Sequence, residues 1–254
     1  MSDTHPAPRA AMLAIGDEIL SGRTKDRNIG HLASVLTLAG IDLKEVRIVP
    51  DETPAIVEAL NALRTTYDFV FTSGGIGPTH DDITADAIGA AFGLPVTVHR
   101  QANERLAASY RSRDLPYTEA RQRMARTPEG ASLIDNPISV APGFRVENVF
   151  VMAGVPSIFA AMLDNVLPTL PSGPAIQSVA ITCPLGEGDI GGPLGEIQKR
   201  HPGTAIGSYP KFDGQRYSTE LVIRSRDPAA IEAARVEVEA MIATVSAATG
   251  AAKA

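Results

Sequence analysis

The segment of residues 72–84 constrains the fold of this chain more than any other. A β-branched and aromatic run, residues 68–72, leads into three glycines within four residues, and an amphipathic stretch follows at residues 83–92. This order predicts a strand, a glycine loop and a helix. Glycines permit a tight turn and let a ligand approach the N–H groups of the loop. The start of the helix adds unpaired donors and a partial positive charge that suit a phosphate.

The loop also has a purely structural interpretation. Glycine-rich turns between a strand and a helix are common in α/β proteins, and this loop matches neither the dinucleotide fingerprint nor the Walker sequence. The adjacent carboxylates Asp81 and Asp82 either cap the helix or hold a divalent cation. The segment therefore predicts a phosphate-binding loop of another kind or a plain turn.

Composition narrows the class of protein. With 254 residues, 44% of them hydrophobic, the chain suits one large domain, or a main domain with a small appendage. A net charge of −6 argues against a nonspecific nucleic-acid binder, which would carry a basic face. An anionic ligand would need backbone dipoles, a few cationic side chains or a metal ion.

Cysteine usage and the lack of targeting signals indicate the compartment. The single cysteine, Cys183, excludes an intramolecular disulfide and a cysteine-cluster metal site, and its apolar surroundings predict a buried side chain. The first nine residues have no signal-peptide core, and no run approaches the ~20 apolar residues of a membrane span. We expect a cytoplasmic protein that binds no membrane.

Alternating patterns over residues 10–92 predict the order β-α-β-α-β-α, and hence parallel strands with helices on both faces of the sheet. The strand-to-helix loops of such a sheet open at its carboxyl edge, and three of them carry paired acids. The pairs are Asp17 with Glu18, Asp51 with Glu52, and Asp81 with Asp82. Each pair alone is most simply a solvated loop charge. Together, with glycines beside two of them, they predict a shared site.

The rest of the chain completes the first unit and predicts a second, smaller one. Residues 99–126 read as helical and rich in arginine, and one or two of these arginines could reach a phosphate or a neighbouring subunit. A buried strand at 149–152 and a helix at 156–167 follow. The Pro- and Gly-rich residues 168–174 are the best linker, so we expect domains at 1–170 and 171–254. The second has the order β-α-β-β-α, which suits a small α+β fold.

With these residues in view, the chain resembles the molybdopterin-binding-domain superfamily of the MoaB/Mog fold. It resembles in particular the N-terminal part of competence/damage-inducible protein A (CinA) and the related domain of eukaryotic FAD synthases. The resemblance covers roughly residues 10–226. Its motifs are residues 16–22, Asn28, Asp51, 74–84, Asn136, 141–144 and 154–156, with 206–210 resembling the subdomain of the FAD-synthase type. It implies a three-layer α/β sandwich with a mostly parallel sheet and a small C-terminal α+β subdomain.

The resemblance implies a small-molecule ligand and several activities. Members bind a pterin–dithiolene phosphate or an adenine nucleotide. CinA-type members are associated with metal-dependent cleavage of the pyrophosphate in ADP-ribose, and the FAD-synthase domain with hydrolysis of FAD. We therefore expect a nucleotide pyrophosphatase that uses Mg²⁺ or a similar ion, with K⁺ as a further candidate. Two alternatives stay open: a molybdopterin binding or transfer protein without hydrolase activity, and a noncatalytic module for oligomerisation. Relatives are often dimers or trimers, so we expect a homo-oligomer.

The family motifs assign roles to residues of this chain. The expected catalytic residues are Asp51, Asp81 and Asp82, and the expected metal ligands are Asp17, Asp51 and Asp82. The expected ligand-binding residues are Gly16, Asp17, Glu18, Asn28, Ser73, Gly74, Gly75, Gly77, Pro78, Thr79, Asn136, Pro142, Gly143, Gly154 and Pro156. Within the loop, Gly74, Gly75, Gly77 and Thr79 are the expected donors to phosphate oxygens.

Two features depart from the family pattern. CinA proteins commonly continue into a nicotinamide-mononucleotide deamidase domain, for which this chain has no room, so we expect no deamidase activity. Ala153 stands where a proline often precedes the Gly-Val-Pro element.

His80 lies inside the glycine loop, where a solvent-facing spacer is the simpler interpretation and a ligand contact the alternative.

Overall fold

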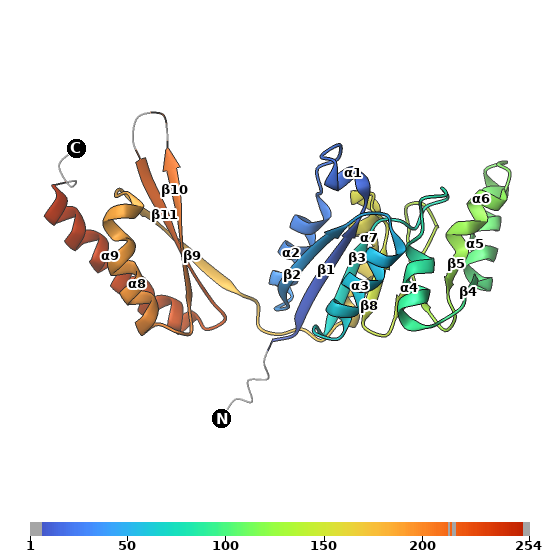
Figure 1. The fold of residues 1–254 in the computed structure, drawn as a ribbon. Coiled ribbons are helices and arrows are strands. Elements are labelled where there is room, and N and C mark those ends of the chain that lie inside the picture. Colours follow the sequence, from blue (N-terminus) through green and yellow to red (C-terminus); the bar gives the residue numbers. More distant parts are fainter. Residues whose placement is uncertain (1–6, 213, 215–216, 251–254) are drawn as a thin grey trace, which may run out of the picture. The chain divides into compact units, whose positions relative to one another are not determined.

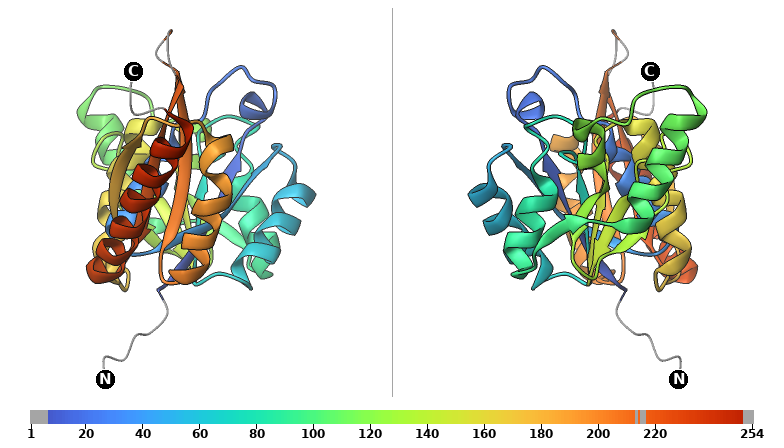
Figure 2. Two further views of the ribbon diagram at one scale, coloured as in Figure 1. Left: turned by 90° about the vertical axis from the view of Figure 1, so that its left-hand side faces the viewer. Right: turned by 90° about the vertical axis from the view of Figure 1, so that its right-hand side faces the viewer.

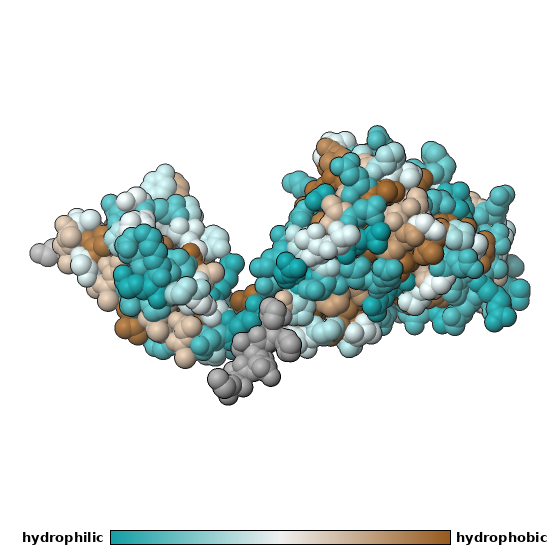
Figure 3. All heavy atoms as spheres, turned by 60° about the horizontal axis from the view of Figure 1, so that its bottom comes forward, coloured by the Kyte–Doolittle hydropathy of each residue, from teal (hydrophilic) through white to brown (hydrophobic). Residues whose placement is uncertain are grey.

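The computed structural model describes residues 7–212, 214 and 217–250. The chain divides into two compact units, Met1–Gly173 and Pro174–Ala254 (Figure 1). No helix in the described ranges combines the length and the apolar composition that crossing a membrane requires. On the face drawn in Figure 3, hydrophilic residues predominate and hydrophobic ones are scattered among them.

The N-terminal unit is built on a six-stranded sheet with the order β2-β1-β3-β8-β7-β6. The strands are β1 (Arg9–Ile15), β2 (Asp42–Val49), β3 (Phe69–Ser73), β6 (Ser132–Ile134), β7 (Gly143–Val146) and β8 (Val149–Met152). The first four in spatial order are parallel, and β7 pairs antiparallel with both β8 and β6. The predicted parallel sheet is therefore confirmed, with an antiparallel extension at one side.

Helices cover both faces of this sheet (Figure 1). They are α2 (Asn28–Leu38), α3 (Thr53–Arg64), α4 (Thr84–Phe92) and α7 (Pro156–Val166), with the short α1 (Asp17–Leu20) following β1. One apolar cluster joins α3 and α4 to the strands, and another joins α2 and α7 to them. Strand β1 is buried along its length after Arg9, as a continuous apolar run between two helical layers requires. The three-layer α/β fold is thus confirmed.

The arginine-rich residues 99–126 are not one continuous helix. They form α5 (Arg100–Ser112), α6 (Glu119–Gln122) and the 3₁₀ turn η1 (Arg123–Ala125). Residue 126 begins the strand β5 (Arg126–Pro128), which pairs with β4 (Val96–Val98). The break after α5 has a local cause. Asp114 has a positive φ of 53°, and Pro116 lacks the N–H that a helix would use.

The C-terminal unit has the predicted β-α-β-β-α order. Its elements, which follow the 3₁₀ turn η2 (Leu167–Thr169), are β9 (Gln177–Cys183), α8 (Glu187–Arg200), β10 (Ala205–Phe212), β11 (Tyr217–Ser225) and α9 (Pro228–Thr249). The strands form an antiparallel sheet with the order β10-β11-β9, and Figure 2 shows α8 and α9 side by side over it. Cys183 lies fully buried in the core of this unit, as predicted.

Candidate functional site

A cavity of about 580 Å³ lies at the carboxyl edge of the large sheet, where β1, β2, β3 and β8 end. Its size is within the range of pockets for small organic ligands. Most of the residues expected from the sequence line it. They are Gly16, Glu18, Asp51, Gly74, Gly75, Gly77, Pro78, Asp81, Asp82, Asn136, Gly154 and Pro156. Loops far apart in the sequence therefore meet at one edge, as the parallel topology predicts.

The glycine loop needs glycine for steric reasons at two positions. Gly74 has a φ of +109°, and a Cβ there would stand 2.2 Å from the carbonyl oxygen of Ile15. Gly75 has a φ of +67°, and its Cβ would stand 2.1 Å from Oγ1 of Thr84. Both positions combine a left-handed backbone with contacts that no side chain tolerates. The loop is thereby held tightly against β1 and the start of α4.

The structure changes the set of phosphate donors expected on this loop. The Gly74 N–H donates to the Met152 carbonyl at 3.1 Å, and the Thr79 N–H donates to Oδ2 of Asp82 at 2.8 Å. These two amides are engaged within the protein. The amides of Gly75, Ile76 and Gly77 make no hydrogen bond within the described part of the chain, and all three residues line the cavity. They are the donors that a ligand can use.

Asp82 closes the loop and does not cap the helix behind it. Its Oδ2 atom accepts hydrogen bonds from both the N–H and the hydroxyl of Thr79, the latter at 2.5 Å. The N-cap of α4 is Ile83, which makes no side-chain capping bond. The capping role considered for Asp81 and Asp82 is therefore wrong. The carbonyl of Asp82 accepts from Nη2 of Arg123 at 3.4 Å, so an arginine from the 99–126 segment does reach the loop.

Negative charge is concentrated at one side of the cavity. Burial, the largest cause, raises the pKa of Asp51, and the charges of Asp17, Glu18 and Asp81 raise it further. The Asp17 N–H, which donates to Oδ2 of Asp51 at 3.0 Å, acts in the opposite direction and fixes the orientation of the carboxylate. The acids of three separate loops thus sense one another across the site.

The carboxylates do not form a ready-made metal cage. Among the described residues, no three His, Cys, Asp or Glu side chains lie close enough together to hold an ion. Asp17, Asp51 and Asp82 are therefore not gathered as one ligand set. Carboxylate oxygens are nevertheless the donors that Mg²⁺ prefers, and this ion usually takes one or two of them and completes its shell with water and phosphate oxygens. The donors present fit an ion that arrives with a phosphate ligand.

Asn28 and Ser73 lie beside the main cavity and have a bracing role. The side chain of Asn28 is 3% exposed, and its amide donates to Oγ of Ser73 at 2.7 Å and to the carbonyl of Gly154 at 2.8 Å. One side chain at the start of α2 thereby ties together the ends of β3 and β8. Both residues line a smaller cavity of about 50 Å³ that adjoins the first.

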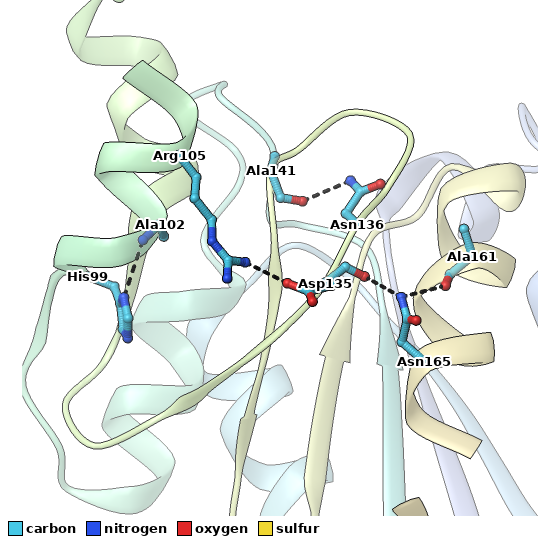
Figure 4. Close-up of polar contacts among 8 residues, drawn as sticks. All are labelled: His99, Ala102, Arg105, Asp135, Asn136, Ala141, Ala161 and Asn165. Atoms are coloured by element: carbon cyan, nitrogen blue, oxygen red, sulfur yellow. Dashed lines mark hydrogen bonds and ion pairs between the residues drawn. The ribbon is translucent and has the colours of Figure 1, made fainter. Parts of the chain in front are cut away.

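The loop that follows β6 is braced in a similar way (Figure 4). The amide of Asn136 donates to the Ala141 carbonyl at 2.8 Å and to Oγ of Ser139, and its oxygen accepts the N–H groups of residues 138 and 139. Its side chain therefore shapes the loop that lines the cavity and has no amide hydrogen left for a ligand.

The neighbouring Asp135 anchors this loop to two helices (Figure 4). Its carboxylate pairs with Arg105 of α5 at 2.6 Å, and its carbonyl accepts from Asn165 of α7 at 3.1 Å. Asn165 also donates to the carbonyl of Ala161 within α7. Helix α5 is itself started by His99, whose Nδ1 accepts the Ala102 N–H at 3.4 Å. The loop position is thus set by packing outside the site.

Several sequence-based assignments lie outside the main cavity. Pro142 is buried and lines a neighbouring small cavity behind the glycine loop. Gly143 is a strand residue whose Cβ would stand 2.4 Å from the carbonyl of Val151. His80 has a 99% exposed side chain, which confirms its interpretation as a solvent-facing spacer.

Nine further residues of the described part of the chain line the cavity in addition to the expected site residues. Those further residues are Ile15, Thr24, Ile76, Met124, Ser139, Ala141, Ala153, Val155 and Ile158. Most are small or apolar side chains at loop positions. Ile76, Ala141 and Val155 lie inside motifs named from the sequence, and most of the others lie within a few residues of one, but Met124 has no such signal.

Comparisons with known proteins show what each unit of the chain resembles. Residues 11–172 match the family described as "Probable molybdopterin binding domain", and residues 175–249 match "FAD synthase, middle domain". A protein of Pyrobaculum arsenaticum is 36% identical over 211 residues, which cover 80% of each chain. A probable FAD synthase of Caenorhabditis briggsae is 29% identical over 92% of this chain and 49% of its own length. The crystal structure of CinA from Thermoplasma acidophilum, a protein of unknown function, has 30% identity and a TM-score of 0.60, covering 64% of this chain and 98% of that one.

Proposed function

The chain belongs to the probable molybdopterin-binding domain family, and we propose that its N-terminal unit binds a nucleotide at the glycine loop and hydrolyses an ADP-containing pyrophosphate. ADP-ribose and FAD are the candidate substrates. The observation that carries this proposal is the cavity of about 580 Å³, which is lined both by loop residues with free amides and by acids from three loops. A divalent cation of the Mg²⁺ type is part of the proposal.

The loop supports binding of a phosphate. The free amides of Gly75, Ile76 and Gly77 are donors held in place by a rigid turn, so they need no reorganisation to bind an anion. None of the described residues that line this cavity is a lysine or an arginine. An anionic ligand there therefore depends on backbone donors and on a cation that it brings with it.

The carboxylates support hydrolysis. A bound cation would neutralise the charge that develops on the phosphate oxygens. Asp51 is half-buried, and its raised pKa makes it a stronger proton acceptor than an exposed aspartate. The Asp17 N–H holds one of its oxygens, which leaves the other to orient a water molecule. Asp82 contributes by holding Thr79 and the loop, and Asp81 by lining the cavity.

The second family match favours a substrate that contains ADP. The C-terminal unit matches the middle domain of FAD synthase. A relative whose match covers 92% of this chain is named a probable FAD synthase. FAD is an ADP-containing pyrophosphate. We therefore place FAD and ADP-ribose before other phosphate esters as substrates.

Binding of molybdopterin without hydrolysis is the second candidate. The description of the family that matches residues 11–172 favours it. A pterin phosphate would use the same loop amides and a flat-ring pocket. This second candidate function predicts tight binding of a pterin and no cleavage of nucleotides at any metal concentration.

The test measures the release of AMP from ADP-ribose and from FAD. The reactions contain Mg²⁺, Mn²⁺ or Co²⁺ together with K⁺, and chromatography detects the AMP. We expect metal-dependent release that Asp51→Asn abolishes. Asp164→Asn is the matched control, because this exposed aspartate on α7 lines none of the cavities described above. No release with any metal, together with retained binding of a pterin, would overturn the hydrolase proposal in favour of the binding protein.

A further inference from the structure

The segment between α1 and α2 forms a second chamber beside the main cavity. The smaller cavity of about 50 Å³ shares Ile15, Glu18, Thr24, Gly154 and Pro156 with the main one. Its remaining lining comes from Ile19, Lys25, Asp26, Arg27, Asn28 and Ser73. Because five residues belong to both linings, the two chambers adjoin. The smaller chamber is therefore the immediate neighbour of the cavity that the glycine loop lines.

Among the described residues, acids line both chambers, but cations line only the smaller one. Four carboxylates line the main cavity, where the described lining includes no cation. The smaller one is lined by two exposed cations, Lys25 and Arg27, together with the carboxylates of Glu18 and Asp26. Within the described part of the chain, neither cationic side chain forms a hydrogen bond or an ion pair, and the one bond of Arg27 is made by its carbonyl, which accepts the N–H of His31 at 3.3 Å. The acid between them, Asp26, accepts the N–H of Ile29 at 2.8 Å through Oδ1 and so is held at the start of α2.

We propose that Lys25 and Arg27 form a second anion subsite, which binds the second phosphate of a pyrophosphate ligand whose first phosphate lies on the glycine loop. The proposal rests on the proposed function and specifies its substrate class. The ligand is a diphosphate with an organic group on at least one end, and a monophosphate fills only the main chamber.

Size and donor chemistry support this assignment. A chamber of about 50 Å³ is far smaller than the 580 Å³ of its neighbour, so it takes a small charged group and excludes a nucleobase. The guanidinium of Arg27 can bind two phosphate oxygens at once, and the ammonium of Lys25 adds a point charge. The firm floor made by Asn28, Ser73 and Gly154 keeps the chamber in shape.

The experiment measures the affinity of AMP, ADP-ribose, FAD and inorganic pyrophosphate by calorimetry for the wild type and for Lys25→Gln/Arg27→Gln. Both side chains are exposed, so the variant keeps its fold, which circular dichroism verifies. We expect binding of ADP-ribose and FAD to weaken about tenfold and that of AMP less than about twofold. The salt dependence of the ADP-ribose affinity falls as well, because two charges no longer contribute.

Arg23→Gln is the matched control. This arginine belongs to the same exposed segment and lines neither chamber, so its loss should change every affinity less than about twofold. Unchanged binding of ADP-ribose in the double variant would overturn the subsite. An equal loss for AMP and ADP-ribose would overturn it too, because that result indicates a general field and not a second phosphate position.

The same data separate the subsite from the proposed function. If the wild type binds pyrophosphate through Lys25 and Arg27 but no nucleotide, the proposed function fails and the anion subsite stands. If the wild type cleaves ADP-ribose and the double variant binds it equally well, the proposed function stands and the subsite fails. If the wild type binds none of the four probes, both are wrong.

Discussion

Replacing Asn28 by alanine should lower both the stability of the N-terminal unit and its affinity for a nucleotide. The buried amide makes two hydrogen bonds, at 2.7 and 2.8 Å, to the ends of β3 and β8. Loss of two such bonds, with the Gly154 carbonyl left without its partner, costs about 2–3 kcal/mol. For a unit of this size the melting temperature should fall by about 4–12 °C. The affinity falls because the Ser73 and Gly154 ends of the strands are no longer held together.

Asn148→Ala is the matched control for this prediction. Its amide also donates to two carbonyls, those of Arg64 at 3.0 Å and Tyr67 at 2.9 Å, but it lies where β8 begins, at the opposite edge of the sheet. Thermal unfolding by circular dichroism should show a comparable loss for both variants. Calorimetry with AMP should show weaker binding only for Asn28→Ala. Equal affinity losses in both variants, or no destabilisation by Asn28→Ala, would contradict the bracing role of Asn28 at the site.

Three further predictions follow from single sites. Gly74→Ala should abolish AMP binding in calorimetry, because a residue with a φ of +109° and a Cβ 2.2 Å from a backbone oxygen forces the loop to move. Gly130→Ala is the control and should leave AMP binding intact, because Gly130 has a φ of +80° but open space around its Cβ position. Burial raises the pKa of Asp51 in the folded protein. Its ionisation therefore lowers the free energy of unfolding once the pH rises above the pKa that Asp51 has in the unfolded chain. Asp51→Asn should therefore raise the melting temperature at about pH 7 and leave it unchanged at about pH 3 in metal-free buffer; the same gain at both pH values would contradict this. Ile190→Ala should destabilise the C-terminal unit by about 2–5 kcal/mol in denaturant unfolding and leave the AMP affinity unchanged, because this fully buried side chain belongs to a core of that unit alone.

The sequence predicted the elements well where periodic apolar runs dominate. Strand β1 (Arg9–Ile15) and helix α2 (Asn28–Leu38) coincide within one residue at each end with the apolar run at 10–15 and the helical spacing at 28–39, because buried strands and amphipathic helices have distinct periods. The continuous helix expected at 99–126 is wrong, because a local left-handed turn at Asp114 and the proline at 116 outweigh the helical composition.

The site could be predicted as a set of loops and only partly as a set of atoms. Parallel topology alone brings the acids and glycines to one edge. Whether an amide is free depends on packing, however, and the Gly74 N–H is engaged by Met152, a residue 78 positions later. The same holds for Asn136, whose bonds stay within its own loop. Lys25 and Arg27 had no signal, since exposed cations beside a cavity look like any solvated charge in a sequence.

The most direct test of the central claim is a titration of ¹⁵N-labelled protein with AMP, followed through the backbone amide resonances. We expect the resonances of the Gly75, Ile76 and Gly77 amides to shift most and to saturate together, while resonances from residues 174–250 stay in place. Shifts confined to the C-terminal unit, or none at the glycine loop while AMP binds, would contradict the claim that this loop holds the phosphate.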